Sequence, residues 1–327
     1  MTLDAIVEAI RTFPGVTRKK AINDVVEYFP TSSFGHIAAS EGEDAAAIEH
    51  GKDYILFATD GIMQSLVESD PFYAGYFAVL VNVNDIAAMG GRPTAMVDVI
   101  SISKSKVCNQ MLRGISAAVK KFNVPIVGGH THPDCNYNAI DISIIGVVPK
   151  EDIIRSCSAK PDDDIIFVMD IDGFYPDGLR YAWDTTTKKG EDIVQAQIEM
   201  MSKIAKGHLV HSGKDMSNPG CLGTLGMMME SSRMGGTVDI EKIPIPDGVD
   251  LTQWLLSYQG CGFVFACPPE NSENVIKMFE TVECKGAVVG KIEDTTEFNI
   301  KMGNERRLLF DFSKDIITGR SPRKKQL

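Results

Sequence analysis

Apolar residues recur along the first half of the chain in two periods, one typical of helices and one of strands. Apolar positions spaced three and four apart predict amphipathic helices over residues 3–10, 72–89 and 107–122. Continuous or alternating apolar runs predict strands over residues 45–48, 54–59, 94–102, 124–127 and 139–148. The run over residues 124–127 is short and precedes two glycines, so we expect a buried strand that ends in a turn.

The second half of the chain also mixes strands with helices, and strands follow one another closely near its end. We predict strands over residues 165–171, 238–245, 260–267, 287–292, 298–302 and 308–312. We predict helices over residues 191–206, 251–257 and 271–281, and one that begins at Pro219 and Gly220. This order indicates an α+β second domain whose helices pack on one side of its sheet.

Chain length and a polar stretch near the middle predict two domains. A chain of 327 residues can form a sizeable core in each of two domains. Charged residues and prolines cluster over residues 149–161, as at an interdomain boundary. We therefore predict an N-terminal domain over residues 1–150 and a C-terminal domain over residues 151–327. The segment 15–42 has little periodicity, and it is either a lid over a substrate or a flexible leader.

Composition and charge exclude several classes of function. The net charge is −11 and the isoelectric point is near 5.1, which disfavours binding to the phosphate backbone of nucleic acids. No apolar run is long enough to span a bilayer, and the first residues lack the pattern of a signal peptide. The seven cysteines form no Cys-x-x-Cys pair, as is typical of reduced thiols in a cytosolic protein. We expect a cytoplasmic protein with no nucleic-acid or membrane partner.

Acidic residues stand at the ends of two predicted strands and on the helix over residues 72–89. Asn82 and Asp85 are three residues apart on that helix, so their side chains leave the same face and can converge on one point. Asp44 lies at the start of one strand, and Asp60 directly follows the next. Because hard cations prefer oxygen ligands, Asp44, Asp60 and Asp85 predict a cation site with three ligands. On the helix alone, an ordinary solvated face is the alternative.

Two further stretches carry residues suited to a ligand. Gly128 and Gly129 allow a ligand to approach the backbone closely, although the neighbouring His130, taken alone, is more typical of a turn histidine. Asp215 and Ser217 precede a predicted helix start, where unpaired backbone amides and the helix dipole attract anions.

Five motifs occur in a fixed order along the chain. They are Gly42-Glu-Asp-Ala-Ala, Ala58-Thr-Asp-Gly61, Asn82-x-x-Asp-Ile-Ala-Ala-Met-Gly-Gly-Arg-Pro93, Val127-Gly-Gly-His-Thr131 and Asp215-Met-Ser-x-x-Gly220. Together they resemble the aminoimidazole ribonucleotide (AIR) synthetase superfamily, which includes thiamine-monophosphate kinase, selenophosphate synthetase and the hydrogenase maturation carbamoyl dehydratase. More narrowly, the chain resembles the AIR-synthase-related proteins described as methanogenesis marker protein 2.

The resemblance implies a fold, an assembly and a set of ligands. It implies a homodimer whose N-terminal domains pair their sheets into a β-barrel, with an α/β C-terminal domain completing each cleft. ATP and several Mg²⁺ ions are expected in these clefts. Matched position by position to thiamine-monophosphate kinase, the metal-binding residues are Asp44, Thr59, Asp60, Asp85 and Asp215. On the same basis we assign nucleotide contacts to Gly129, His130, Arg155 and Ser217, and catalysis to Asp85 and Asp215.

The chain departs from the kinase pattern at three places. His130 stands where the kinase has Asp, although selenophosphate synthetases also have His, and Asn218 replaces a second Asp near the last motif. Mg²⁺ prefers oxygen to imidazole, so one metal site is in question. The acidic tyrosine motif of the kinase is replaced over residues 260–265, which leaves thiamine phosphate unsupported as a substrate. Lys19 and Lys20 are more typical of surface charges than of catalysts.

The leading hypothesis is an Mg²⁺-dependent enzyme that uses ATP to phosphorylate, and so activate, a small-molecule acceptor. ATP carries about four negative charges, so metal ions must lie between it and a carboxylate cluster. The alternative is a nucleotide-binding regulatory or assembly protein without turnover, which the changes at His130 and Asn218 favour. The sequence leaves the identity of the acceptor open.

Overall fold

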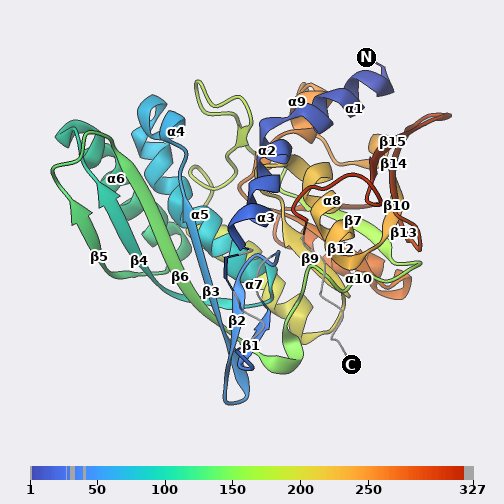
Figure 1. Ribbon diagram of the computed structural model, residues 1–327, viewed down its shortest axis with the longest axis horizontal. Helices are drawn as coiled ribbons and strands as arrows, with labels where there is room; N and C mark the ends of the chain where they lie inside the picture. Colours follow the sequence, from blue (N-terminus) through green and yellow to red (C-terminus); the bar gives the residue numbers. More distant parts are fainter. Residues whose placement is uncertain (1, 27, 30–33, 40–41, 320–327) are drawn as a thin grey trace.

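The computed structural model describes residues 2–26, 28–29, 34–39 and 42–319, which build two large sheets joined by a central helix. Figure 1 shows the first sheet at one end of the molecule and the second sheet at the other, with helix α5 (Pro71–Ala88) between them. The α+β class predicted from the sequence is confirmed at this level. The predicted β-barrel requires a second copy of the chain, and it stays a prediction.

The first sheet has six strands in the order β1-β2-β3-β6-β4-β5. Their bounds are β1 Ile37–Ala39, β2 Ala46–His50, β3 Asp53–Gly61, β4 Arg92–Ser101, β5 Ile126–His132 and β6 Ala139–Pro149. Alternate residues of β6 are buried beneath α5 and α6 (Ser105–Phe122), because successive side chains of a strand point to opposite faces. The other face of this sheet is exposed, and it carries Phe57, Val97, Val99, Val127 and Ile145.

Helix α5 is buried on almost every side, as its apolar sequence requires. Asp70 caps its first turn by accepting a hydrogen bond from the backbone N–H of Tyr73 at 3.0 Å, and Pro71 occupies the first position. Gly75 of α5 and Gly114 of α6 let the two helices cross closely. The prediction of a helix over residues 72–89 is confirmed. Neither α5 nor any other helix in the described part of the chain is long and apolar enough to cross a membrane.

The second sheet has seven strands in the order β15-β14-β10-β13-β7-β12-β9. Their bounds are β7 Asp164–Met169, β9 Ser212–Asp215, β10 Gly235–Asp239, β12 Gly262–Cys267, β13 Lys285–Glu293, β14 Glu297–Met302 and β15 Glu305–Asp311. A separate two-stranded sheet pairs β8 (Ala182–Trp183) with β11 (Tyr258–Gln259). The strand predicted over residues 238–245 is wrong beyond Asp239, where the chain turns into the 3₁₀ helix η4 (Ile240–Lys242).

Helices cover both faces of the second sheet, so the prediction of helices on one side is wrong. Ile166 and Val168 of β7 pack in one core with α7 (Glu191–Lys206) and α10 (Pro269–Glu280). Ile165 and Phe167 pack in the other core with α8 (Gly220–Ser232), α9 (Leu251–Leu255) and α1 (Leu3–Thr12). Every residue of β7 is buried, as in a strand covered on both faces.

The N-terminal segment packs on the second sheet and is more regular than the sequence suggested. Helix α1 is followed by α2 (Pro14–Thr17), the 3₁₀ helix η1 (Arg18–Lys20) and α3 (Ala21–Val26). The predicted irregular segment 15–42 is therefore helical over its first part, while its residues 27, 30–33 and 40–41 lie outside the described residues. The domain boundary at residue 150 stays a prediction, and α1 contacts the far domain through an ion pair of Arg11 with Asp315 at 2.9 Å.

Strand β5 is the edge strand of the first sheet, and this corrects the sequence interpretation. A short buried strand over residues 124–127 was expected, followed by a turn. Instead β5 continues through the two glycines to His132, pairs in parallel with β4, and exposes every residue after Ile126. The apolar residues over 124–127 indicated a buried strand. A strand at the end of a sheet has a neighbouring strand on one side only, so it stays in contact with solvent.

We expect the substitution Gly114→Ala to destabilise the protein by about 1–3 kcal/mol, the typical loss on overpacking a tight contact. A Cβ at this position would overlap the carbonyl oxygen of Phe72 in α5, so the two helices must separate. Urea unfolding followed by circular dichroism measures the loss. Gly190→Ala is the matched control, because a Cβ there meets no atom within 4 Å, and it should change stability by less than about 0.5 kcal/mol. Equal stability of both variants would contradict the close helix crossing.

Candidate functional site

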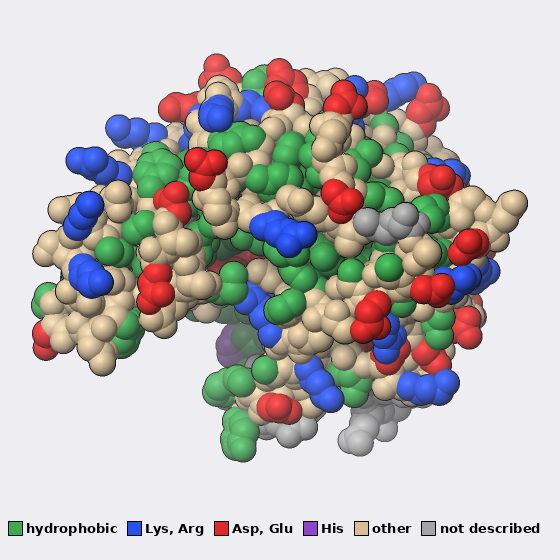
Figure 2. Space-filling model, turned by 90° about the horizontal axis from the view of Figure 1, so that it is seen from above, with side chains coloured by type: hydrophobic (Ala, Val, Ile, Leu, Met, Phe, Trp, Pro, Cys, Tyr) green, Lys and Arg blue, Asp and Glu red, His purple; other side chains and the backbone are tan. Residues whose placement is uncertain are grey.

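A cavity with a volume of about 360 Å³ lies where the two domains meet. Its walls come from the loop before β2, the end of β3, helices α4 (Gln64–Ser69) and α5, the end of β9, and the N-terminal 3₁₀ helix η1. Figure 2 shows the molecule hollowed beside the lobe that carries the first sheet, with basic side chains facing the hollow. The cavity therefore gathers residues from elements that are distant in sequence.

Three carboxylates converge in this cavity. Asp44 precedes β2, Asp85 lies in the last turns of α5, and Asp215 ends β9. One oxygen atom from each lies within 4.8 Å of the other two. Asp60, near the end of β3, lines the same cavity. All four predicted aspartates thus line one cavity, but the close cluster contains Asp215 in place of the Asp60 of the predicted three-ligand site.

Burial and mutual repulsion disfavour the charged forms of these carboxyl groups. Burial raises the pKa of Asp85 well above its ordinary value, and the charges of Asp215, Asp60 and Asp44 raise it further. Burial also raises the pKa of Asp215 to about 7, with Asp44 the next contributor. A bound cation would reverse this, because it stabilises the ionised carboxylates that hold it.

Lys214 is the buried cation nearest this cluster. Its side chain is only 2% exposed, and its Nζ forms an ion pair with Asp44 Oδ1. Burial is the largest single influence and lowers the pKa of Lys214, but the charge and hydrogen bond of Asp44, together with the charges of Glu43 and Asp215, outweigh it and raise the pKa. The position of Lys214 is set by the pairing of β9 with β12. In this register Lys214 lies opposite Val264, and both residues are buried.

The donor set fits a magnesium ion. The side chain of Asp44 is only 7% exposed, and its buried Oδ2 has no hydrogen-bond partner among the described residues. An unpartnered buried carboxylate oxygen is costly unless a ligand satisfies it. Carboxylates at mutual distances below 4.8 Å match the oxygen ligands that Mg²⁺ prefers. Asp44, Asp85 and Asp215 would hold the ion.

The start of helix α8 forms the floor on one side of the cavity. Ser217 and Asn218 line the cavity directly before the helix. Gly220 has a φ of +74°, and a Cβ there would overlap the carbonyl oxygen of Leu255, so only glycine fits. In this tight turn the backbone N–H of Gly220 donates to the carbonyl oxygen of Ser217 at 2.9 Å, so α8 begins shortly after the cavity-lining residues Ser217 and Asn218.

Helix α5 contributes Asn84 to the cavity where the sequence predicted Asn82. Asn84 lines the cavity beside Asp85 and donates a hydrogen bond to the carbonyl oxygen of Gly260 at 3.2 Å. Asn82 is fully buried and donates to the carbonyl oxygen of Ala78 in its own helix at 2.8 Å. The predicted convergence of Asn82 and Asp85 is therefore wrong, because the side chain of Asn82 turns back along α5.

Thr59 and Ser217 line the cavity as predicted, whereas three other predicted residues do not line it. Gly129 and His130 lie on the exposed edge strand β5. The backbone of Arg155 pairs with Ser212 beside β9, and its carbonyl oxygen accepts a hydrogen bond from Ser212 Oγ at 2.7 Å. The nucleotide contacts assigned to these three residues stay predictions.

Two basic residues of the N-terminal segment line the cavity, and the sequence interpretation had missed them. Arg18, an exposed residue, and Lys19, a partly buried one, both line the cavity from η1, whereas their exposed neighbour Lys20 lies outside the cavity lining. Burial lowers the pKa of Lys19, and the charge of Asp60 partly offsets this effect. The expectation that Lys19 is a surface charge is therefore wrong. A basic pair just after the Pro14 helix start was the available signal.

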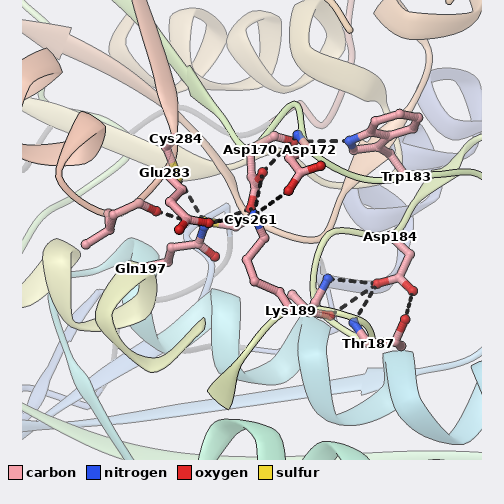
Figure 3. Close-up of polar contacts among 12 residues, drawn as sticks. Asp170, Asp172, Trp183, Asp184, Thr187, Lys189, Gln197, Cys261, Glu283 and Cys284 are labelled. Atoms are coloured by element: carbon pink, nitrogen blue, oxygen red, sulfur yellow. Dashed lines mark hydrogen bonds and ion pairs between the residues drawn. The ribbon is translucent and has the colours of Figure 1, made fainter. Parts of the chain in front are cut away.

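A second polar network holds the segment 170–190, here called the strap, against the rest of the molecule (Figure 3). Lys189 Nζ forms ion pairs with Asp170 at 3.0 Å, Asp172 at 3.3 Å and Glu283 at 3.2 Å, so it ties the end of the strap to its beginning. The Nε1 of Trp183 donates to the backbone carbonyl oxygen of Asp170 at 3.1 Å. Trp183 also lines the cavity, so the network fixes part of its wall.

Comparison with known protein families gives two matches that together cover most of the chain. Residues 42–148 match the N-terminal domain of AIR synthase related protein, and residues 179–303 match its C-terminal domain. An uncharacterized protein of Methanocaldococcus jannaschii is 45% identical over 325 residues, covering 98% of this chain and all of that protein.

Solved structures share the fold at low sequence identity. The T. maritima PurL structure complexed with FGAR has a TM-score of 0.78 at 16% identity, covering 98% of this chain and 54% of PurL. The present chain thus spans about half the length of PurL. A ThiL structure complexed with AMPPCP and TMP has a TM-score of 0.64 at 16% identity, covering 87% of this chain and 93% of ThiL.

We expect the substitution Lys214→Met to make stability depend on divalent cations. Without Lys214, Asp44 loses its buried partner, and such a loss typically destabilises by about 3–5 kcal/mol. Thermal unfolding in EDTA should show this loss, and added Mg²⁺ should raise the Tm of the variant more than that of the wild type, because the ion replaces the missing charge. Lys106→Met removes an exposed lysine and serves as the control. Equal Mg²⁺ shifts in all three proteins would contradict this role of Lys214.

Proposed function

Because this chain belongs to the AIR synthase related protein family, we propose that it is an Mg²⁺-dependent enzyme that uses ATP to phosphorylate a small-molecule acceptor. The family match covers the motifs that supply Asp44, Asp85 and Asp215. Phosphorylation of the acceptor would activate it for a following step. The observation that carries this proposal is the convergence of these three carboxylates at the bottom of a cavity between two domains.

The charge of the cavity favours a metal-bound polyphosphate over a metal-free one. Several carboxylates would repel ATP directly, so a cation has to lie between the two groups. Asp44, Asp85 and Asp215 would hold Mg²⁺, which when bound would supply positive charge that stabilises the transferring phosphoryl group. The protein then has mainly to hold donor and acceptor in line.

Residues of this chain are placed to position the phosphates. Ser217 and Asn218 line the cavity shortly before α8, and the positive end of the helix dipole that follows them favours an anion. Thr59 and Asp60 provide further oxygen atoms at the opposite wall. The structures of PurL with ATP and of ThiL with AMPPCP support nucleotide binding by this fold.

A homodimer is part of this proposal, and the exposed face of the first sheet supports it. Five large apolar side chains on this face are at least 40% exposed, namely Phe57, Val97, Val99, Val127 and Ile145. A contiguous exposed apolar face commonly marks an interface. Gly61 at the cavity edge lies in the same register row as Asp141, Val99 and His130. Pairing of two such faces would bring His130 and Gly129 of one protomer toward the other.

We expect Asp85→Asn to weaken Mg²⁺-dependent binding of AMPPCP at least tenfold, about 1.4 kcal/mol, because a metal ligand is lost. Isothermal titration calorimetry with and without Mg²⁺ measures this effect. Asp247→Asn, an exposed carboxylate outside the cavity, is the control and should bind like the wild type. Wild-type protein that binds no AMPPCP, or binding unchanged in Asp85→Asn, would refute the proposed site.

Turnover distinguishes the enzyme from a nucleotide-binding regulatory protein. Release of ADP that depends on an added small molecule supports the enzyme.

We expect Phe57→Glu to shift the protein from dimer to monomer, because a charge would be buried in the paired sheets. Sedimentation equilibrium measures the molecular mass directly. Leu112→Glu is the matched control, since Leu112 is 44% exposed on α6, away from the sheet face. A monomeric wild type, or a dimer that both variants leave intact, would rule out the sheet face as the interface.

A further inference from the structure

The cavity carries two positive charges on the wall formed by the N-terminal segment. Arg18 and Lys19 of η1 line it together with the carboxylates of Asp60 and Asp215. Burial of part of the Lys19 side chain means that this charge is held at the site and not simply solvated. An acidic cavity with a basic wall can hold an anion close to a metal-bound phosphate without strong repulsion.

The basic wall is fixed in place by close packing. Gly15 lies against the backbone and side-chain oxygens of Asn218, so closely that a Cβ would overlap both. Val16 of α2 is only 4% exposed and packs in the core beneath α8. Arg18 and Lys19 follow directly, so their backbone is anchored to the same turn that carries Asp215 and Ser217. A ligand therefore meets a wall that is already formed.

Neither cation is used in an ion pair within the described part of the chain. Arg18 Nη1 donates a hydrogen bond to Met63 Sδ at 2.9 Å, and a thioether sulfur is a weak acceptor. The charge of Asp60 acts on Lys19, but no carboxylate of the described residues lies within ion-pair distance of Lys19 Nζ. Other lysines of this chain do form such pairs, as Lys214 does with Asp44. Two uncommitted cations in a cavity favour an anionic ligand.

Apolar and aromatic side chains line another part of this cavity. Leu66, Phe77 and Leu80 line it from α4 and α5, and Trp183 and Tyr258 line it from the small two-stranded sheet. Apolar and aromatic walls with a few charged groups are typical of sites for small organic molecules. The strap network around Lys189 holds Trp183 in this wall.

We propose that Arg18 and Lys19 bind the anionic group of the acceptor, a carboxylate or a phosphate, while its apolar body packs against Trp183, Phe77 and their neighbours. This inference rests on the proposed function, since it assigns the acceptor side of that site. Each cation would donate charge-assisted hydrogen bonds to the anion. Selectivity for anionic acceptors then resides in η1.

The test uses three probes that share one aromatic ring system: 1-naphthyl phosphate, 1-naphthoate and neutral 1-naphthol. Their binding to the full chain, with Mg²⁺ and AMPPCP present, is measured by naphthyl fluorescence. We expect at least one of the two anionic probes to bind the wild type about tenfold more tightly than 1-naphthol. The double variant Arg18→Met, Lys19→Met should lose this preference. The anion whose affinity falls more identifies the acceptor group as phosphate or carboxylate.

Two matched variants separate this role from a general effect of charge or of folding. Lys20→Met removes the neighbouring exposed lysine and should keep the preference. The charge-conserving pair Arg18→Lys, Lys19→Arg should largely restore it. Equal binding of anionic and neutral probes to the wild type would overturn the proposal. A preference that survives in the double variant, or falls equally in Lys20→Met, would also overturn it.

Nucleotide binding distinguishes failure of this inference from failure of the proposed function. If the double variant keeps the naphthyl preference but loses affinity for Mg²⁺ and AMPPCP, Arg18 and Lys19 serve the nucleotide and the inference is wrong. The proposed function would still hold in that case. If the wild type binds no AMPPCP yet prefers the anionic probes in a manner that needs both cations, the proposed function fails and the anion site stands.

Discussion

Uncompensated negative charge between the two domains is the constraint on which the site depends. Asp44, Asp85 and Asp215 come together on three different elements, and among the described residues only Lys214 forms an ion pair with one of them. Bringing carboxylates this close is unfavourable in a low-dielectric interior, as their raised pKa values show. The fold tolerates this arrangement because packing elsewhere holds the elements in place, and a cation would relieve it.

Helix α5 makes this convergence possible because it serves both domains. It packs on the first sheet through one side and on α7 and β9 of the second domain through another. Its closely crossing neighbour α6 and its partly buried cap at Asp70 leave it little freedom to rotate. Asp85 therefore faces the cavity from a rigid element, while β9 brings Lys214 and Asp215 from the other side. Rigid support of this kind is what precise metal and phosphate geometry needs.

Much of the fold and of the acidic site could be predicted from the sequence, because both depend on local sequence patterns. The helix over α5 and the acids near strand ends follow from periodicity and position alone. What failed depended on packing partners. The orientation of Asn82 and Asn84 is set by what surrounds α5, and the exposure of β5 is set by its place at the sheet edge. Likewise, no local pattern shows that helices cover both faces of the second sheet.

The sequence motifs did not reveal the wall formed by Arg18 and Lys19, because these two residues lie outside the part of the chain that carries the motifs. Arg18 and Lys19 stand before residue 42, outside both regions that match the family, while Asp44, Asp85 and Asp215 lie within them. The residues proposed to hold the metal and the phosphates thus belong to the shared part of the fold. The wall proposed to face an acceptor belongs to a segment the family match does not cover, and Gly15 allows that segment to pack on Asn218. A family can keep one phosphoryl-transfer core and change its acceptor by changing such a segment, since charge and shape on one wall are altered without disturbing the carboxylates.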